Sequence, residues 1–200
     1  MEIILVRHGE SEADILNVHE GRADFSLTSK GRQQAEALAE YGSKHFSVSH
    51  IYSSTLKRAK ETADIINHKL NRPISFVEDL MEWNNGVLAG LSREEAMEKY
   101  PEPKGGRKPH EPIEEGESYL DFRLRAERVF STLRHKHADE SIMIVSHGGA
   151  ISNMLNAFYQ MPVVSPYLFS TGDTGFHLLA IKNNERLTRV LNCQVHLIRK

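Results

Sequence analysis

The stretch Met1-Glu2-Ile3-Ile4-Leu5-Val6-Arg7-His8-Gly9 decides the fold. Its run of aliphatic residues, most of them β-branched, predicts a buried strand of the kind found in parallel sheets. The strand ends at two polar residues and a glycine. The same succession returns late in the chain, where the apolar run Ile142-Met143-Ile144-Val145 is followed by Ser146-His147-Gly148-Gly149.

Working outward from this strand, signals of strand and helix alternate along the chain. Such alternation predicts an α/β fold, a three-layer α/β/α sandwich with a mostly parallel central sheet. Further strands are expected over residues 49–53, 74–77, 142–145, 175–181 and 187–197, the last two joined by a turn at 182–185. Helices are expected over residues 28–40, 55–70 and 117–137, and from the second glycine-rich junction to about 159.

The length of 200 residues suits one domain with one core. One stretch breaks the alternation, since residues 101–116 are rich in proline, glycine and charge. We interpret it as a small lid inserted at about residues 92–116 of a single domain that spans residues 1–200.

Composition excludes several classes of function. The formal net charge is −2 and the isoelectric point is near 6.6, so the basic surplus of a nucleic-acid-binding protein is missing. No apolar stretch approaches the roughly 20 residues that cross a bilayer, and the short apolar start does not resemble a signal peptide. Cys193 is the single cysteine, which suits a reducing compartment. We therefore expect a cytoplasmic protein with neither nucleic acid nor membrane as partner; the sequence indicates no oligomeric state.

Three junctions between a strand and a helix carry polar residues of matching kind: Arg7-His8-Gly9-Glu10, residues 53–59, and Ser146-His147-Gly148-Gly149. In an open parallel sheet, ligands gather beyond the carboxyl ends of the strands. Two histidines and two arginines on one rim predict an anion pocket, because guanidinium groups match phosphate oxygens and glycines let backbone N–H groups approach them. Phosphoryl transfer depends mostly on positioning and charge stabilisation, so this set is suited to it without a metal.

These motifs resemble those of a known family. Arg7-His8-Gly9-Glu10-Ser11 resembles its signature, residues 53–63 its second motif, Leu80-Met81-Glu82 with two following glycines its acid motif, and Ser146-His147-Gly148-Gly149 its last. Four motifs in family order make the chain similar to the phosphatase branch of the histidine-phosphatase superfamily, which is phosphoglycerate-mutase-like in fold.

The resemblance implies a role for each matched residue in the hydrolysis of a phosphorylated small molecule. His8 would attack phosphorus and form a phosphohistidine. Arg7, Arg58 and His147 would hold the phosphoryl oxygens, together with Gly148. Glu82 would protonate the departing alkoxide and then activate water. No cofactor and no metal are implied.

The sequence departs from the family at the loop that follows the nucleophile. Family members commonly carry Trp-Asn where this chain has Ala13 and Asp14, and often carry Gln where Glu20 precedes Gly21. A carboxylate should repel phosphate unless it turns away or binds a cationic group of the substrate. If this segment is helical, Asn17 would share a face with Asp14 and could replace the missing amide. We therefore include Asp14, Asn17 and Gly21 among the substrate-binding candidates.

Other candidates for specificity are neighbours of the motifs in sequence. Trp83 follows the predicted acid, and Arg22 and Phe25 follow Gly21. The lid contributes four groups able to meet an anion, Lys104, Arg107, Lys108 and His110. The alternative is that the two aromatic residues belong to the core and that the lid charges are solvated. The nine histidines other than His8 and His147 are expected to be ordinary surface or hydrogen-bonded residues.

Two other functions remain open at this point. A cofactor-dependent phosphoglycerate mutase would share the catalytic residues, but the mutases are typically longer and carry His-Gly-Asn where this chain has His147-Gly148-Gly149. A catalytically inactive phosphate-binding regulatory module would share the fold. All five catalytic candidates are present, which favours the phosphatase.

Overall fold

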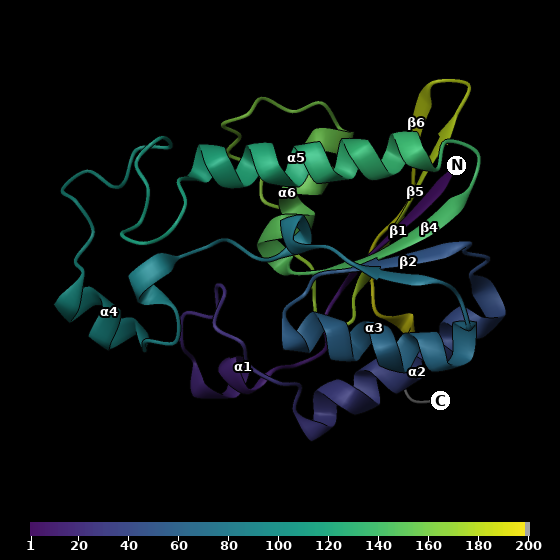
Figure 1. The fold of residues 1–200 in the computed structure, drawn as a ribbon, viewed down its shortest axis with the longest axis horizontal. Coiled ribbons are helices and arrows are strands. Elements are labelled where there is room, and N and C mark those ends of the chain that lie inside the picture. The colour runs from purple at the N-terminus through teal and green to yellow at the C-terminus, as the bar shows by residue number, and fades with distance from the viewer. Residues whose placement is uncertain (199–200) are drawn as a thin grey trace.

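A six-stranded sheet forms the centre of the protein, as a computed structural model that describes residues 1–198 shows (Figure 1). The strand order is β3-β2-β4-β1-β5-β6. β1, β2, β3 and β4 pair in parallel, whereas β5 is antiparallel to β1 and forms a hairpin with β6. The strands are β1 (Glu2–Arg7), β2 (His50–Ser53), β3 (Ile74–Phe76), β4 (Ser141–Ser146), β5 (Phe176–Lys182) and β6 (Glu185–Cys193).

Helices cover both faces of the sheet, which confirms the predicted α/β sandwich. α5 (Tyr119–Lys136) and α6 (Gly148–Phe158) lie on one face, and α2 (Ser29–His45) and α3 (Lys57–Leu70) lie on the other (Figure 1). Successive residues of a strand point to opposite faces. Ile3 and Leu5 accordingly pack in the cluster with α5 and α6, and Ile4 and Val6 in the cluster with α2 and α3.

Two predicted boundaries differ from the structure by more than two residues. α2 continues five residues past the expected end at residue 40, because its buried face continues through Gly42, which packs closely against Phe46. The last strand was predicted to reach residue 197 but ends at Cys193. Asn192 adopts a left-handed φ of 45° and Gln194 donates to the Asp173 carbonyl, so the chain leaves the sheet and forms the 3-10 turn η3 (Val195–Leu197).

Several short elements have no counterpart in the sequence prediction. They are α1 (Glu12–Leu16), α4 (Arg93–Lys99) and the 3-10 turns η1 (Glu78–Leu80) and η2 (Gly86–Leu88). α4 occupies the first part of the expected lid, and residues 101–116 beyond it carry only turns and bends. Figure 1 shows α4 and the following loop displaced to the side of the sheet at which the parallel strands end. Closure of this segment over a substrate stays a prediction.

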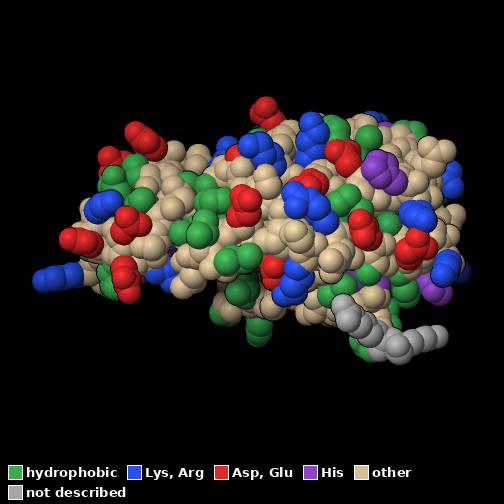
Figure 2. All heavy atoms as spheres, turned by 90° about the horizontal axis from the view of Figure 1, so that it is seen from below, with side chains coloured by type: hydrophobic (Ala, Val, Ile, Leu, Met, Phe, Trp, Pro, Cys, Tyr) green, Lys and Arg blue, Asp and Glu red, His purple; other side chains and the backbone are tan. Residues whose placement is uncertain are grey.

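The surface carries charges of both signs. Figure 2 shows acidic and basic side chains interspersed over the face seen from below in Figure 1. None of the helices within residues 1–198 combines the length and hydrophobicity that a membrane crossing requires.

Candidate active site

The three polar junctions meet at one edge of the sheet. β1 lies beside β4, with Arg7 paired in register with Ser146, and β2 lies on the other side of β4. The residues that follow these strands are therefore neighbours, and the rings of His8 and His147 have centroids 5.1 Å apart. This arrangement follows directly from the parallel order of the strands.

His8 is fully buried at the base of this site. Its Nδ1 lies 2.7 Å from the backbone carbonyl of Gly9. A carbonyl oxygen only accepts hydrogen bonds, so the proton of a neutral His8 resides on Nδ1, and Nε2 keeps its lone pair. Nε2 is directed toward Arg58, whose Nε donates to it at 3.3 Å. The ring is thus held with its nucleophilic nitrogen facing a cation.

Arg58 supplies that cation from the first turn of α3, and its side chain is fully buried. Its terminal nitrogens donate to the carbonyls of Gly21 (2.8 Å) and Ala23 (2.9 Å), which fixes the loop after α1. Burial lowers the pKa of Arg58, and the nearby carboxylates of Glu20 and Glu82 oppose this change. A guanidinium stays charged in proteins, so Arg58 is a permanent positive charge here.

His147 caps the N-terminus of α6 and is also fully buried. Its Nε2 lies 2.8 Å from Ser54 Oγ, and its Nδ1 has no hydrogen-bond partner among residues 1–198. Burial, with Arg58 and His8 nearby, lowers the pKa of His147 well below its ordinary value. A Cβ added to the next residue, Gly148, would meet nothing within 4 Å, so there is open space beside this histidine. A buried polar nitrogen without a partner in the protein is suited to bind a ligand oxygen.

Glu82 lies against the same helix N-terminus. Its Oε2 accepts from the backbone N–H of Gly149, and its Oε1 from that of Trp83, both at 2.8 Å. These two bonds hold the carboxyl group beside the residue that follows Gly148. The structure therefore brings Glu82 to the pocket although it is 65 residues away from His147 in the sequence.

Arg125 of α5 is a residue that the sequence analysis missed. Its guanidinium donates to the carbonyls of Asp79, Met81 and Glu82 and pairs with Glu117 at 2.6 Å, so it fixes the backbone that carries the acid. A signal was available, because Arg125 falls on the apolar stripe of its helix, three residues after the buried Phe122. A charge on a buried helix face needs partners there.

Arg7 is surrounded by acceptors. Its terminal nitrogens contact the Thr171 carbonyl at 2.9 Å, Asp173 at 3.3 Å and Asp14 at 3.4 Å. Asp14 therefore turns toward Arg7, and it also accepts from the backbone N–H of Ser11 at the start of α1. The expectation for Asn17 is wrong in one respect: α1 ends before it, and Asn17 is an exposed left-handed cap rather than a residue on the helical face of Asp14.

Glu20 contacts two of the catalytic candidates. Its carboxylate accepts from Ser11 Oγ at 2.5 Å, and it lies 3.1 Å from Arg58 Nε and 3.6 Å from His8 Nε2. Burial favours the neutral acid, but the hydrogen bond and charge of His8 in its protonated form, the charge of Arg58 and the hydrogen bond from Ser11 lower the pKa of Glu20 to about 2. Arg58 and Ser11 act in the same direction when His8 is neutral. Glu20 is therefore ionised at physiological pH. The sequence indicated an acidic residue near the site but not its contact with His8.

The specificity candidates divide into packed and exposed groups. Trp83 stacks on Phe122 and donates from Nε1 to the Glu117 carbonyl, yet one side of it lines a cavity of about 290 Å³ with Arg107 and Lys108 of the predicted lid. Arg22 reaches Glu117 at 3.8 Å and Phe25 is half-buried, whereas Lys104 and His110 are exposed.

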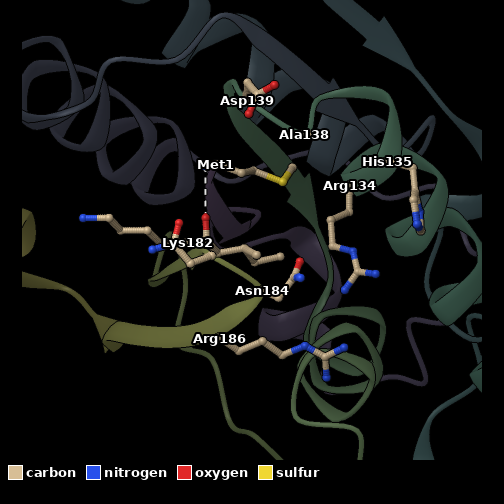
Figure 3. Close-up of a pocket in the computed structure, with 10 residues that line it drawn as sticks. Met1, Arg134, His135, Ala138, Asp139, Lys182, Asn184 and Arg186 are labelled. Carbon is tan, nitrogen blue, oxygen red and sulfur yellow. Dashed lines mark hydrogen bonds between the residues drawn. The ribbon is translucent and has the colours of Figure 1, made fainter.

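Cavity size does not mark this site. A cavity of about 620 Å³ lies at the other end of the sheet, beside the first residue of the chain and the turn between β5 and β6. Figure 3 shows Arg134 and Arg186 extending along it, and the amino group of Met1 donates a hydrogen bond to the Ile181 carbonyl. None of the predicted site residues lines this cavity.

Comparison with known proteins agrees with the geometry. Residues 3–194 match the model of the histidine phosphatase superfamily, branch 1. The chain belongs to the histidine phosphatase superfamily. Among related histidine phosphatases, phosphoserine phosphatase 1 of Hydrogenobacter thermophilus is 29% identical over 98% of this chain and 94% of its own length. The phosphoglycerate mutase-like protein 4 of Arabidopsis thaliana is 37% identical over 76% of this chain and 69% of its own.

A solved histidine phosphatase has nearly the same fold. The alpha-ribazole phosphatase from Shigella flexneri superposes with a TM-score of 0.88 and 26% identity, covering 97% of both chains. The predicted family, fold class and phosphatase activity are thereby confirmed. The identities of the site residues, the covalent intermediate and the substrate remain proposals.

Proposed function

We propose that this histidine phosphatase hydrolyses a phosphomonoester of a small molecule through a phosphohistidine on His8. The observation that carries the proposal is the proton-free Nε2 of His8. The Gly9 carbonyl accepts from Nδ1 of His8, so Nε2 keeps its lone pair and faces the fully buried Arg58, with the fully buried ring of His147 beside it. A nucleophile needs a free lone pair and a fixed direction, and His8 has both.

The neighbouring groups would stabilise the charge that develops on the phosphoryl oxygens. Arg58 offers a permanent charge, Arg7 a second one, and Gly148 an approach free of side-chain atoms. If Ser54 donates its hydroxyl proton to Nε2 of His147, the proton of this histidine lies on Nδ1, which has no other partner and is available to a phosphoryl oxygen. Donors fixed in a buried site act without reorganisation when the charge develops.

Glu82 would act as the general acid and base. It lies at the edge of the pocket beside Gly149, where it can meet the oxygen that leaves and later the water that attacks. Arg125 acts through Glu82 as a positioning residue. The proposed chemistry uses no metal and no cofactor.

The substrate would contact the groups on the rim, namely Asp14, Asn17, Gly21 and Trp83. The two phosphatases named above, a phosphoserine phosphatase and an alpha-ribazole phosphatase, are named for different compounds, so the proposal stops at the class of phosphorylated small molecules. We also propose a single domain over residues 1–200, with residues 92–116 as its lid, and a cytoplasmic location without nucleic acid or membrane as partner. The near-neutral net charge of the chain supports the absence of a nucleic-acid partner.

The test is incubation with p-nitrophenyl phosphate in EDTA. We expect turnover, and a phosphoprotein that loses its phosphate in acid, as phosphohistidine does. Absence of both from acidic to neutral pH would favour the inactive regulatory module. Transfer of the phosphoryl group to a second phosphoglycerate in preference to water would favour the mutase.

A further inference from the structure

The carboxylate of Glu20 lies on the groups that the proposed function assigns to the phosphoryl group. It is 3.1 Å from Arg58 Nε and 3.6 Å from His8 Nε2. We propose that Glu20 occupies the phosphate subsite in the free enzyme and competes with the phosphoryl group for it, which weakens the binding of phosphate. This inference rests on the proposed function, and it adds a residue that sets how tightly substrate and product are held.

Glu20 contacts one particular nitrogen of the Arg58 guanidinium. The terminal nitrogens of Arg58 donate to the Gly21 and Ala23 carbonyls, so Nε is the nitrogen that faces the nucleophile. Glu20 Oε1 approaches that nitrogen, and Ser11 Oγ donates to the same carboxylate oxygen. Glu20 therefore contacts the nucleophile and the catalytic cation together, rather than the outer rim.

A carboxylate and a phosphate dianion cannot share this space. Their like charges repel strongly when both are removed from water. Binding of the phosphoryl group therefore requires that Glu20 leaves Arg58 and His8 or takes up a proton. Each event weakens the binding of phosphate relative to a pocket that has a neutral side chain at this position.

The loop around Glu20 permits its side chain to move without the backbone. The carbonyls of Gly21 and Ala23 are fixed by Arg58. Gly21 has a φ of 46°, and a Cβ there would lie 1.7 Å from Asn85 Oδ1, so the backbone is closely packed. The Glu20 side chain, by contrast, is 20% exposed and has access to solvent. Rotation about its own bonds is enough to vacate the subsite.

The contacts that Glu20 does not make explain how a phosphoester replaces it. The Nδ1 of His147 is buried and has no hydrogen-bond partner among residues 1–198, so Glu20 satisfies only the Arg58 and His8 side of the pocket. A phosphoryl group carries three terminal oxygens and can reach both sides. The extra contact lets a phosphoryl group displace Glu20, while the competition weakens the binding of phosphoester and free phosphate alike and so favours release of the product.

The test compares Glu20→Gln with Glu40→Gln. The first substitution removes the charge and keeps the shape. The second removes one carboxylate from the surface, where Glu40 pairs with Lys69, and controls for net charge. Binding of inorganic phosphate is measured by calorimetry, and its inhibition constant is measured against p-nitrophenyl phosphate. We expect the dissociation constant and the inhibition constant of phosphate to fall at least tenfold in Glu20→Gln, with a lower KM and no gain in kcat. Both constants should stay unchanged in Glu40→Gln.

A second variant covers the case in which Glu20→Gln does not fold. Ser11→Ala removes the hydroxyl that holds Glu20 in place, and we expect a smaller decrease of the same constants. Unchanged or weaker phosphate binding in the folded variants overturns the inference. Calorimetry needs no turnover, so the two proposals fail separately: tighter phosphate binding in a protein without phosphatase activity would overturn the proposed function alone.

Discussion

The base and the rim of the pocket are built on different principles. At the base, the side chains of His8, Arg58 and His147 are fully buried, and each makes a hydrogen bond with a residue of another segment. At the rim, α1 and residues 101–116 are mostly exposed. A buried polar group that loses its partner is costly, so the base tolerates little change. Exposed segments lack this constraint, and they are the place where specificity can vary.

The largest effect should come from the base. We expect His8→Ala to reduce turnover of p-nitrophenyl phosphate below about a hundredth of wild type, because no other group is placed to form the covalent intermediate. His137→Ala is the matched control, since His137 is also buried but bonds to Tyr52 away from the site. Thermal denaturation checks that both variants fold. Activity of folded His8→Ala well above that level would contradict the role of His8.

At the boundary between base and rim, the effect of Glu82→Gln should depend on the leaving group. An alkoxide needs a proton to leave, so kcat/KM for an alkyl phosphate should fall about 10²–10⁴-fold. p-Nitrophenolate leaves without help, so kcat/KM for its ester should fall much less. The comparison uses kcat/KM because slow hydrolysis of the phosphohistidine would lower kcat for both substrates. Equal losses would remove Glu82 from the acid role.

On the rim, Asp14→Asn should have a modest effect of opposite sign. Asp14 contacts Arg7, and an uncharged amide there should leave Arg7 more attractive to phosphate. We expect KM for simple phosphomonoesters to fall about threefold, in the range of partly exposed ion pairs. Glu12→Gln is the control, because Glu12 is also an acid in the first turn of α1. An unchanged or raised KM would show that Asp14 serves a different group of the substrate.

The smallest effects are expected in the lid. Arg107 lines the cavity beside Trp83 and donates to the Pro112 carbonyl, whereas Lys104 is exposed. We expect Arg107→Ala to raise KM by a few fold for the phosphorylated metabolite that the enzyme hydrolyses best. Lys104→Ala should leave this KM unchanged, as for most surface substitutions. A panel of phosphorylated metabolites supplies the substrates. A larger effect of Lys104→Ala would mean that the lid closes in another way.

The base was predictable because it follows from local signals. His8 and His147 each come directly after an apolar strand and before glycine, and parallel strands end at the same edge of a sheet. Arg58 belongs to the third such junction, which follows β2, whereas Glu82 needed the family resemblance, since nothing in its spacing alone brings it to that edge.

The roles of Arg125 and Glu20 depend on contacts that the spacing of residues in the sequence does not reveal. Arg125 reaches the backbone at Glu82 from a helix that begins 37 residues later, and the direction of the Glu20 side chain is set by Arg58 and Ser11. The short helices α1 and α4 have too few turns for periodicity, but a capping box precedes each of them. That signal, Ser11 with Asp14 and Ser92 with Glu95, was present in the sequence and was not used.

Arg125 has a consequence for engineering. Its guanidinium ties the backbone of Glu82 to Glu117, the residue at which the chain returns from the predicted lid to the core of the molecule. The loop is therefore anchored at its root independently of what its tip contains. Segments of other length and composition, grafted between Ser92 and Gly116, should leave the proton donor in register, which makes this histidine phosphatase a scaffold on which substrate preference can be exchanged as a cassette.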